Sequence, residues 1–277
     1  MVPVSMAVML LLLCSCTSGT GEPQAQYPSN PPIGAVAVIL KPEQVSRPID
    51  AFYPTPDQIV HLAMARQEQM NHCLSAAGIN QTFAYPPAPS ITVFALTIAE
   101  DRVTRSSLWG FFDPANAAKY GYQHSAAAKT TLSIPPQTKE AQQKCPLTSS
   151  TTRDPLTFVF DWSLPDKGPP TPATDARFVR AVADWSTCMG SKGFNYKNPL
   201  EALGAFRSET SPSPRQTRTA SADVACKIKS NFVGKSLAVQ VTYDNLYIAR
   251  DSARLAQFRA QFEQGVSASP TPRLLGG

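Results

Sequence analysis

A short phrase that occurs twice constrains the fold of this chain more than any other feature. Residues 73–80 and 188–195 each begin with a cysteine, carry a glycine five positions later and end with an apolar residue and an asparagine. Glycine is favoured just beyond the C-terminal end of a helix, so Gly78 and Gly193 each predict a helix that ends there. Each helix would carry a cysteine near its last turn. We therefore expect a mainly α-helical domain stapled by disulfides, and the repetition is compatible with two related halves.

The body of the chain contains four cysteines: Cys73, Cys145, Cys188 and Cys226. In an exported protein this even number implies two disulfides. We favour the sequential pairing, first with second and third with fourth, because Cys145 and Cys226 share an Ala-x-x-x-Cys helical context. The loops of 72 and 38 residues that it closes are each worth about 4 kcal/mol in the chain-entropy treatment. The two interlocking pairings stay open. A zinc site is a weaker alternative, because thiols outside the cell are oxidised.

The N-terminus predicts export. Residues 6–13 are apolar, which matches the core of a signal peptide and is too short to cross a bilayer. The following Leu13-Cys14-Ser15-Cys16 resembles the lipobox of bacterial lipoproteins, and Cys16 fits the position that receives the lipid. Residues 1–15 would then be a signal peptide and residues 16–46 a flexible tether. The first five residues lack the Lys or Arg that such signals normally carry, and an ordinary secretory signal cleaved elsewhere is the alternative.

Composition indicates helices separated by proline-rich loops. The chain is 43% hydrophobic and only 16% charged, and it contains 26 prolines, so it can bury a substantial core while keeping rigid connections. Prolines between residues 164 and 172 mark a boundary near residue 168, between a first helical half (47–168) and a second (169–265). Residues 266–277 are expected to be a disordered tail. The net charge of +5 is dispersed, so we expect no nucleic-acid partner.

Capping signals place several helices. Thr55-Pro56-Asp57-Gln58 is a capping-box start, and Ser213-Pro214-Arg215-Gln216 repeats it before the segment that carries Cys226. Residues 174–192 have helical periodicity, and residues 113–120 and 139–145 predict two short helices. Residues 91–105 could be helix or strand, and residues 33–40 could lie extended across the body. Residues 237–264 lack Pro and Gly, which predicts one long C-terminal helix ending at Gly265 and following an interruption near Gly234.

We identify no catalytic motif, metal site or cofactor site. His61 and His72 share a predicted helix, but eleven residues place them roughly 16 Å apart along it, too far for one metal ion. Asp161-Trp162-Ser163 and Asp184-Trp185-Ser186 are compatible with sugar stacking beside an acid. For Trp185 we instead expect core packing against a disulfide, because it lies three residues before Cys188 on the same helical face.

Several motifs resemble a family of uncharacterised actinobacterial secreted lipoproteins. The likeness rests on the sequence from Asp184 to Met189 with Gly193-Phe194, on the stretch from Ala222 to Lys227, and on two shorter ones, Arg47-Pro48-Ile49-Asp50-Ala51-Phe52-Tyr53 and Tyr120-Gly121-Tyr122. It covers residues 47–264 in patches. The resemblance implies an exported, largely helical protein and supplies no catalytic residues.

These observations lead to two functional hypotheses. The first is a cell-surface binding or interaction module, lipid-anchored to the extracytoplasmic face of the membrane, that contacts a cell-envelope protein or a small ligand. The second is an enzyme acting on the cell envelope, with dispersed carboxylates such as Asp161 and Asp184 as acid and base. The second requires a cleft that holds paired acidic residues. A purely structural envelope protein is a third, less favoured reading.

Overall fold

The computed structural model describes residues 27–82, 88–123, 138–145 and 164–267, and the fold is mainly α-helical, as the sequence predicts. The predicted signal peptide, Cys16, Asp161 and the predicted tail beyond residue 267 lie outside these ranges. None of the helices in the described ranges combines the length and the hydropathy that crossing a membrane requires.

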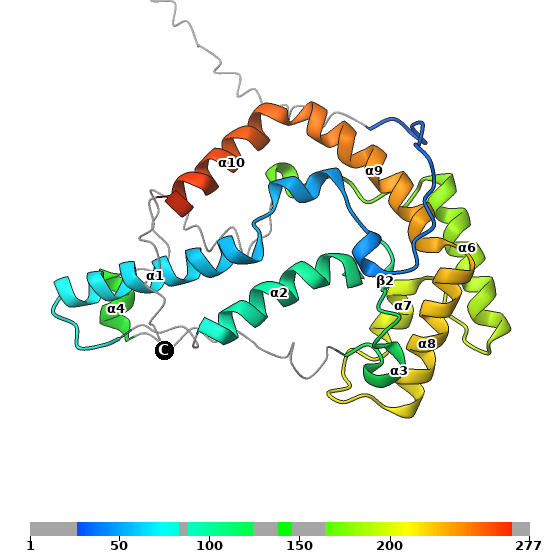
Figure 1. The fold of residues 1–277 in the computed structure, drawn as a ribbon, viewed down its shortest axis with the longest axis horizontal. Coiled ribbons are helices and arrows are strands. Elements are labelled where there is room, and N and C mark those ends of the chain that lie inside the picture. The colour runs from blue at the N-terminus through cyan, green and yellow to red at the C-terminus, as the bar shows by residue number, and fades with distance from the viewer. Residues whose placement is uncertain (1–26, 83–87, 124–137, 146–163, 268–277) are drawn as a thin grey trace, which may run out of the picture.

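The described residues of the first part of the chain form helices α1 to α4 and a small hairpin (Figure 1). These are α1 (Pro56–Ala76), α2 (Ala88–Thr104), β1 (Arg105–Ser106), β2 (Gly110–Phe111), α3 (Ala117–Tyr120) and α4 (Lys139–Lys144). The second part forms α6 (Ala176–Ser191), α7 (Pro199–Gly204), α8 (Pro214–Lys229), α9 (Phe232–Arg250) and α10 (Ser252–Ser267). Short 3-10 helices occur at η1 (Pro42–Gln44), η2 (Pro48–Phe52) and η4 (Pro165–Lys167). The ambiguous stretch 91–105 is therefore helical over most of its length.

Local capping confirms several predicted helix ends. The Thr55 hydroxyl accepts a hydrogen bond from the Gln58 backbone N–H, and the Gln58 side chain accepts one from the Thr55 N–H, which completes the capping box. Gly78 and Gly193 adopt positive φ angles of 69° and 82°, each directly after the C-cap residue of its helix, Ala77 and Lys192, as expected of helix-terminating glycines. These ends depend on a few neighbouring residues, which is why the sequence reveals them.

The start of α8 agrees with the prediction only in part. Ser213 accepts a hydrogen bond from the Gln216 backbone N–H at 3.1 Å, as a cap should. The Gln216 side chain does not return the bond. It is buried, its Oε1 accepts from the Tyr122 N–H at 3.3 Å, and its Nε2 donates to Glu209. Tertiary packing therefore replaces half of the expected capping box.

The predicted single C-terminal helix is wrong, because α9 and α10 meet at a bend at Asp251 (Figure 1). The bend allows α10 to place Leu255 and Phe258 in a cluster with Ile49, Leu164 and Tyr247. Gly265 does not end the helix, which runs to Ser267. The expected interruption near Gly234 lies instead at Asn231, which has a φ of 48° and separates α8 from α9.

Both disulfides form with the predicted sequential pairing. Cys73–Cys145 joins α1 to the end of α4, with Cα atoms 5.9 Å apart, and Cys188–Cys226 joins α6 to α8, with Cα atoms 5.6 Å apart. The first disulfide supports a cluster of side chains from α1, α2 and α4. The second lies in the largest cluster of the described chain.

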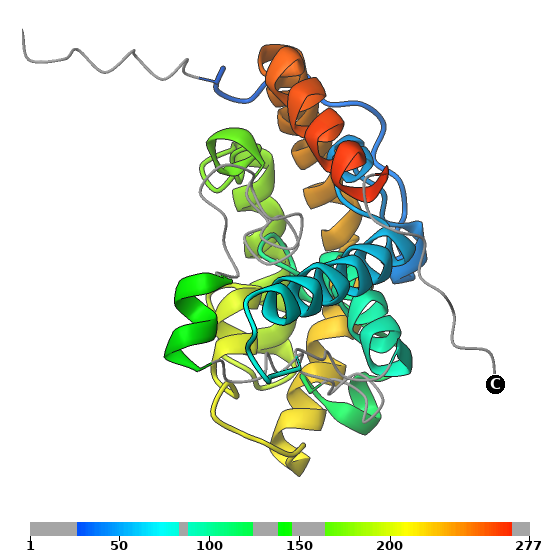
Figure 2. The same cartoon turned by 90° about the vertical axis from the view of Figure 1, so that its left-hand side faces the viewer.

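The largest cluster combines segments from both sides of residue 168. Trp109 and Phe112, which flank β2, pack in it together with Trp185 on α6 and Phe232 on α9, and all four are fully buried. Helices α1 and α2 run side by side, and α10 ends beside α1 (Figures 1 and 2). The division of the chain into halves at residue 168 stays a prediction.

Candidate ligand-binding site

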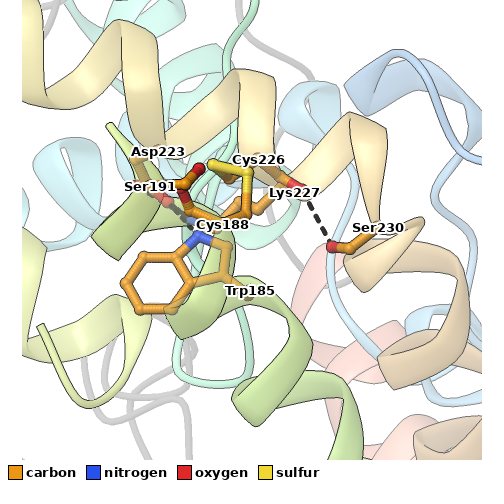
Figure 3. The surroundings of a disulfide bond; sticks show 7 residues. All are labelled: Trp185, Cys188, Ser191, Asp223, Cys226, Lys227 and Ser230. Atoms are coloured by element: carbon orange, nitrogen blue, oxygen red, sulfur yellow. Dashed lines mark hydrogen bonds and ion pairs between the residues drawn. A yellow bond between two sulfur atoms is a disulfide. The ribbon is translucent and has the colours of Figure 1, made fainter. Parts of the chain in front are cut away.

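The inner face of α8 carries a buried ion pair beside the Cys188–Cys226 disulfide (Figure 3). The Lys227 ammonium lies 2.7 Å from the Asp223 carboxylate, and both side chains have zero exposed surface. Lys227 also donates to the Phe111 carbonyl at 2.6 Å. The Asp223 carboxylate further accepts from the Trp185 indole at 2.9 Å and from the Tyr122 hydroxyl at 3.3 Å. This network connects α8 to α6 and to the segment around β2.

Burial sets the acid–base properties of the network. It raises the pKa of the Asp223 carboxyl and lowers the pKa of the Lys227 ammonium, and the attraction between the two charges opposes both shifts. Burial, with the neighbouring Asp223 carboxylate, also raises the pKa of the Tyr122 hydroxyl. Because neither charged group reaches solvent, the pair cannot contact a ligand. We interpret it as the support that positions α8.

The outer face of the same helix borders a surface depression of about 720 Å³. Residues of α3, of the end of α6 and of α8 line it: Ala118, Lys192, Phe194, Thr217, Arg218, Ser221, Ala222 and Ala225. Ala222 directly precedes Asp223 of the buried ion pair, and Ala225 directly precedes Cys226 of the disulfide. The depression and the buried ion pair therefore share α8.

Two cations without an ion-pair partner in the described chain characterise this depression. Lys192 is the residue after α6, where the helix ends before Gly193, and Arg218 lies on the first turns of α8; both are exposed. Neither has an acidic partner within the described ranges, and no lining residue is acidic. Phe194 adds a half-buried ring, and Ser221 adds a hydroxyl.

Such a lining suits an anionic group. Lysine and arginine bind carboxylate, phosphate and sulfate through charge-assisted hydrogen bonds. The phenyl ring and the alanines offer contact to an apolar part of the same ligand. The lining residues that the structure describes include no histidine, cysteine or carboxylate. No group of three or more such side chains that could hold a metal ion occurs within the described ranges.

The residues that the sequence analysis considered for ligand binding or catalysis do not lie together in one site. Trp185 is fully buried, so its predicted role in core packing is confirmed. Asp184 is half exposed and pairs with Lys235 at 2.9 Å on the surface, outside the depression. Asp161 falls outside the described residues, so the paired-acid cleft of the enzyme hypothesis stays untested there. His61 and His72 both lie on α1, away from the depression.

Sequence reasoning missed the depression and the buried ion pair. Asp223 and Lys227 stand four residues apart in a helix, which ordinarily indicates an exposed pair, and nothing local shows that both are buried. Lys192 and Arg218 are 26 residues apart, and only the packing of α6 against α8 brings them to one depression.

Comparison with protein-family models, with curated proteins and with solved structures finds no match.

Proposed function

We propose that this chain is an exported protein, lipid-anchored through Cys16, whose helical body binds an anionic small ligand at the cell surface. The ligand occupies the depression between α3, α6 and α8. One observation carries the proposal: Lys192 and Arg218 both line a depression in which none of the described lining residues is acidic. A carboxylate, phosphate or sulfate could accept charge-assisted hydrogen bonds from both cations at once.

The proposed location is supported by the cysteines. Two disulfides in one small protein are typical of an oxidising compartment. The apolar run at residues 6–13 and the lipobox-like Leu13-Cys14-Ser15-Cys16 add an export signal and a lipid attachment point. A tether between Cys16 and the folded body would hold the depression away from the membrane surface.

Titration calorimetry of the full chain with an anionic cell-wall fragment, muramyl dipeptide, tests the binding site, with inorganic phosphate as a second probe. We expect saturable binding of at least one probe, and its loss in Lys192→Glu/Arg218→Glu. A matched control is Arg180→Glu/Lys139→Glu, which changes the net charge equally at exposed positions outside the depression. Equal binding by both double variants, or no binding of either probe to the wild type, would contradict the proposal.

Mass spectrometry tests the anchor independently of the ligand. We expect the mature chain to begin at Cys16 and to carry a diacylglycerol, because the lipobox places cleavage between Ser15 and Cys16. Cys16→Ser should release the protein from the membrane fraction of intact cells. A mature chain that begins elsewhere and lacks lipid would overturn the anchor while leaving the binding site to its own test.

A further inference from the structure

The solvent-facing side of α8 carries positive charge only. The helix contains four cations and a single acidic residue, Asp223. Asp223 is buried in the ion pair with Lys227, so neither of these two side chains contributes charge to the surface. The other three cations of the helix, Arg215, Arg218 and Lys229, are exposed, and none of them forms an ion pair within the described ranges. The outward face of α8 therefore presents three positive charges that no acidic side chain of the described chain neutralises.

These three cations form one stripe along the helix. At 3.6 residues per turn, Arg218 and Lys229 lie within about 60° of Arg215 around the helix axis, and Arg215 and Lys229 are about 21 Å apart along it. The depression occupies the middle of the stripe, because Arg218 and Ala225 both line it. Arg215 and Lys229 are not among its lining residues. A ligand that fills only the depression therefore leaves both ends of the stripe without a partner.

The end of α6 adds a fourth cation and an aromatic ring beside the stripe. Lys192 follows Cys188 by one helical turn, and the disulfide between Cys188 and Cys226 holds this end of α6 against α8. Phe194 contributes a half-buried ring to the depression, and Ser221 contributes a hydroxyl. An aromatic ring can pack against the apolar face of a sugar ring, and a hydroxyl can exchange hydrogen bonds with sugar hydroxyls. The middle of the stripe is thus suited to a sugar that carries an acidic group.

The stripe begins at the end of the body that lies farthest from the first described residues. Residues 27–34 (dark blue) lie at one end of the molecule, whereas α3 and the start of α8 lie at the opposite end in both views (Figures 1 and 2). On a protein held through Cys16, the start of α8 would be directed away from the membrane. This placement favours a polymer of the cell wall over a lipid headgroup as the partner.

We propose that the stripe binds an extended anionic polysaccharide of the cell wall. The chain crosses the depression along α8 and places successive acidic groups at Arg215, Arg218 and Lys229, which bind them through charge-assisted hydrogen bonds. This inference rests on the proposed binding of an anionic ligand in the depression, and it identifies that ligand as one part of a longer chain. Charges repeated over about 21 Å of helix match a polymer with repeated charges better than a single small molecule.

Oligogalacturonates of two and eight residues test the proposal, because each residue carries one carboxylate and only the octamer is longer than the stripe. Titration calorimetry of the detergent-purified full chain measures both affinities. The octamer contains seven overlapping dimers, so a site of dimer length would favour it by about sevenfold at most. We expect the octamer to bind at least about fiftyfold more tightly than the dimer. A gain of about sevenfold or less would overturn the proposal.

A substitution at the end of the stripe separates this inference from the proposed function. We expect Lys229→Gln to weaken octamer binding at least fivefold and to leave dimer binding unchanged, because Lys229 lies outside the depression. Lys139→Gln makes the same change at an exposed position on α4 and should alter neither affinity. Equal octamer affinities of these two variants would refute the polymer, even where Lys192→Glu/Arg218→Glu abolishes dimer binding. Dimer binding that survives in Lys192→Glu/Arg218→Glu would instead refute the proposed function.

Two further probes examine the class of partner. Octaglutamate carries carboxylates without sugar rings, and we expect it to bind at least tenfold more weakly than the octagalacturonate. Equal affinities would show that the surface recognises charge alone and would overturn the polysaccharide as the partner. Vesicles of phosphatidylglycerol should not bind in a manner that depends on Lys229, and tight vesicle binding that Lys229→Gln abolishes would assign the stripe to a membrane surface instead.

Discussion

Removing the buried ammonium of α8 should destabilise the protein severely. In Lys227→Met, the Asp223 carboxylate loses a partner 2.7 Å away while both positions stay shielded from solvent. The Phe111 carbonyl loses its hydrogen bond from Lys227 as well. Breaking a buried ion pair by removing one partner costs about 3–5 kcal/mol, so we expect the free energy of unfolding to fall by about 4 kcal/mol.

Urea denaturation at pH 7.5 with both disulfides intact measures this loss. The matched control is Lys229→Met, two residues further along the same helix, where the side chain is exposed. A surface substitution of this kind should change the free energy of unfolding by no more than about 0.5 kcal/mol. A loss below about 1 kcal/mol in Lys227→Met would refute the conclusion that the pair supports the core.

A second substitution should restore part of the loss. In Asp223→Asn/Lys227→Met no charge is buried, and the amide oxygen can still accept the hydrogen bond from Trp185. We expect this double variant to recover about 2 kcal/mol relative to Lys227→Met. The free energy of unfolding lost in the double variant is compared with the sum of the losses in Asp223→Asn and Lys227→Met. If the two are equal, the side chains do not act as a pair.

The pH dependence of Lys227→Met follows from the same reasoning. Burial already holds the pKa of Asp223 above its ordinary value of 3.8, and loss of the ammonium raises it further. A carboxyl with a raised folded-state pKa contributes stability that is fully present below its unfolded pKa and lost as the pH rises through the folded pKa. The deficit of Lys227→Met relative to the wild type should therefore be smaller at pH 4 than at pH 7.5.

Three further predictions concern other parts of the fold. Gly234→Ala should lower the free energy of unfolding by about 1–3 kcal/mol in urea denaturation, although alanine favours helices, because a Cβ at Gly234 would lie 2.0 Å from the Ala37 carbonyl oxygen. Burial raises the pKa of Asp101 to about 6, so the stability associated with its protonated form is lost as the pH rises from about 4 through 6. Asp101→Asn should flatten that part of the pH–stability profile, and an unchanged slope would contradict the shift. Cys188→Ser/Cys226→Ser should lower the free energy of unfolding by about 4 kcal/mol for a loop of 38 residues, and a melting temperature equal to the wild type's would contradict it.

The helix ends and the disulfides could be predicted because their signals are local or few in number. Thr55 caps α1 through Gln58, three residues away, and Gly193 ends α6 through its own backbone angle. Four cysteines allow only three pairings, and the matching contexts of Cys145 and Cys226 favoured the one that the structure shows. Periodicity left residues 91–105 open between helix and strand, and only the structure shows that most of this segment is helical.

The bend at Asp251 shows where local reasoning fails. Residues 237–264 contain neither Pro nor Gly, so nothing in their own sequence divides them. The break places Leu255 against Ile49 and Tyr247, contacts that depend on segments far away in the chain. Burial of those side chains outweighs the few hydrogen bonds that an unbroken helix would add.

By itself, the sequence determined the helical class, the capped helix starts and the disulfide pairs, because each depends on residue type and on short spacing. The anchor at Cys16 stays a prediction. Only the tertiary structure decided that Asp223 and Lys227 are buried and that Lys192 and Arg218 share one depression. It also decided that the Asn231 side chain holds the backbone of Ala37 and Ile39 against the start of α9. These features arise from the packing of distant segments, where solvent exposure and proximity are properties of the whole fold.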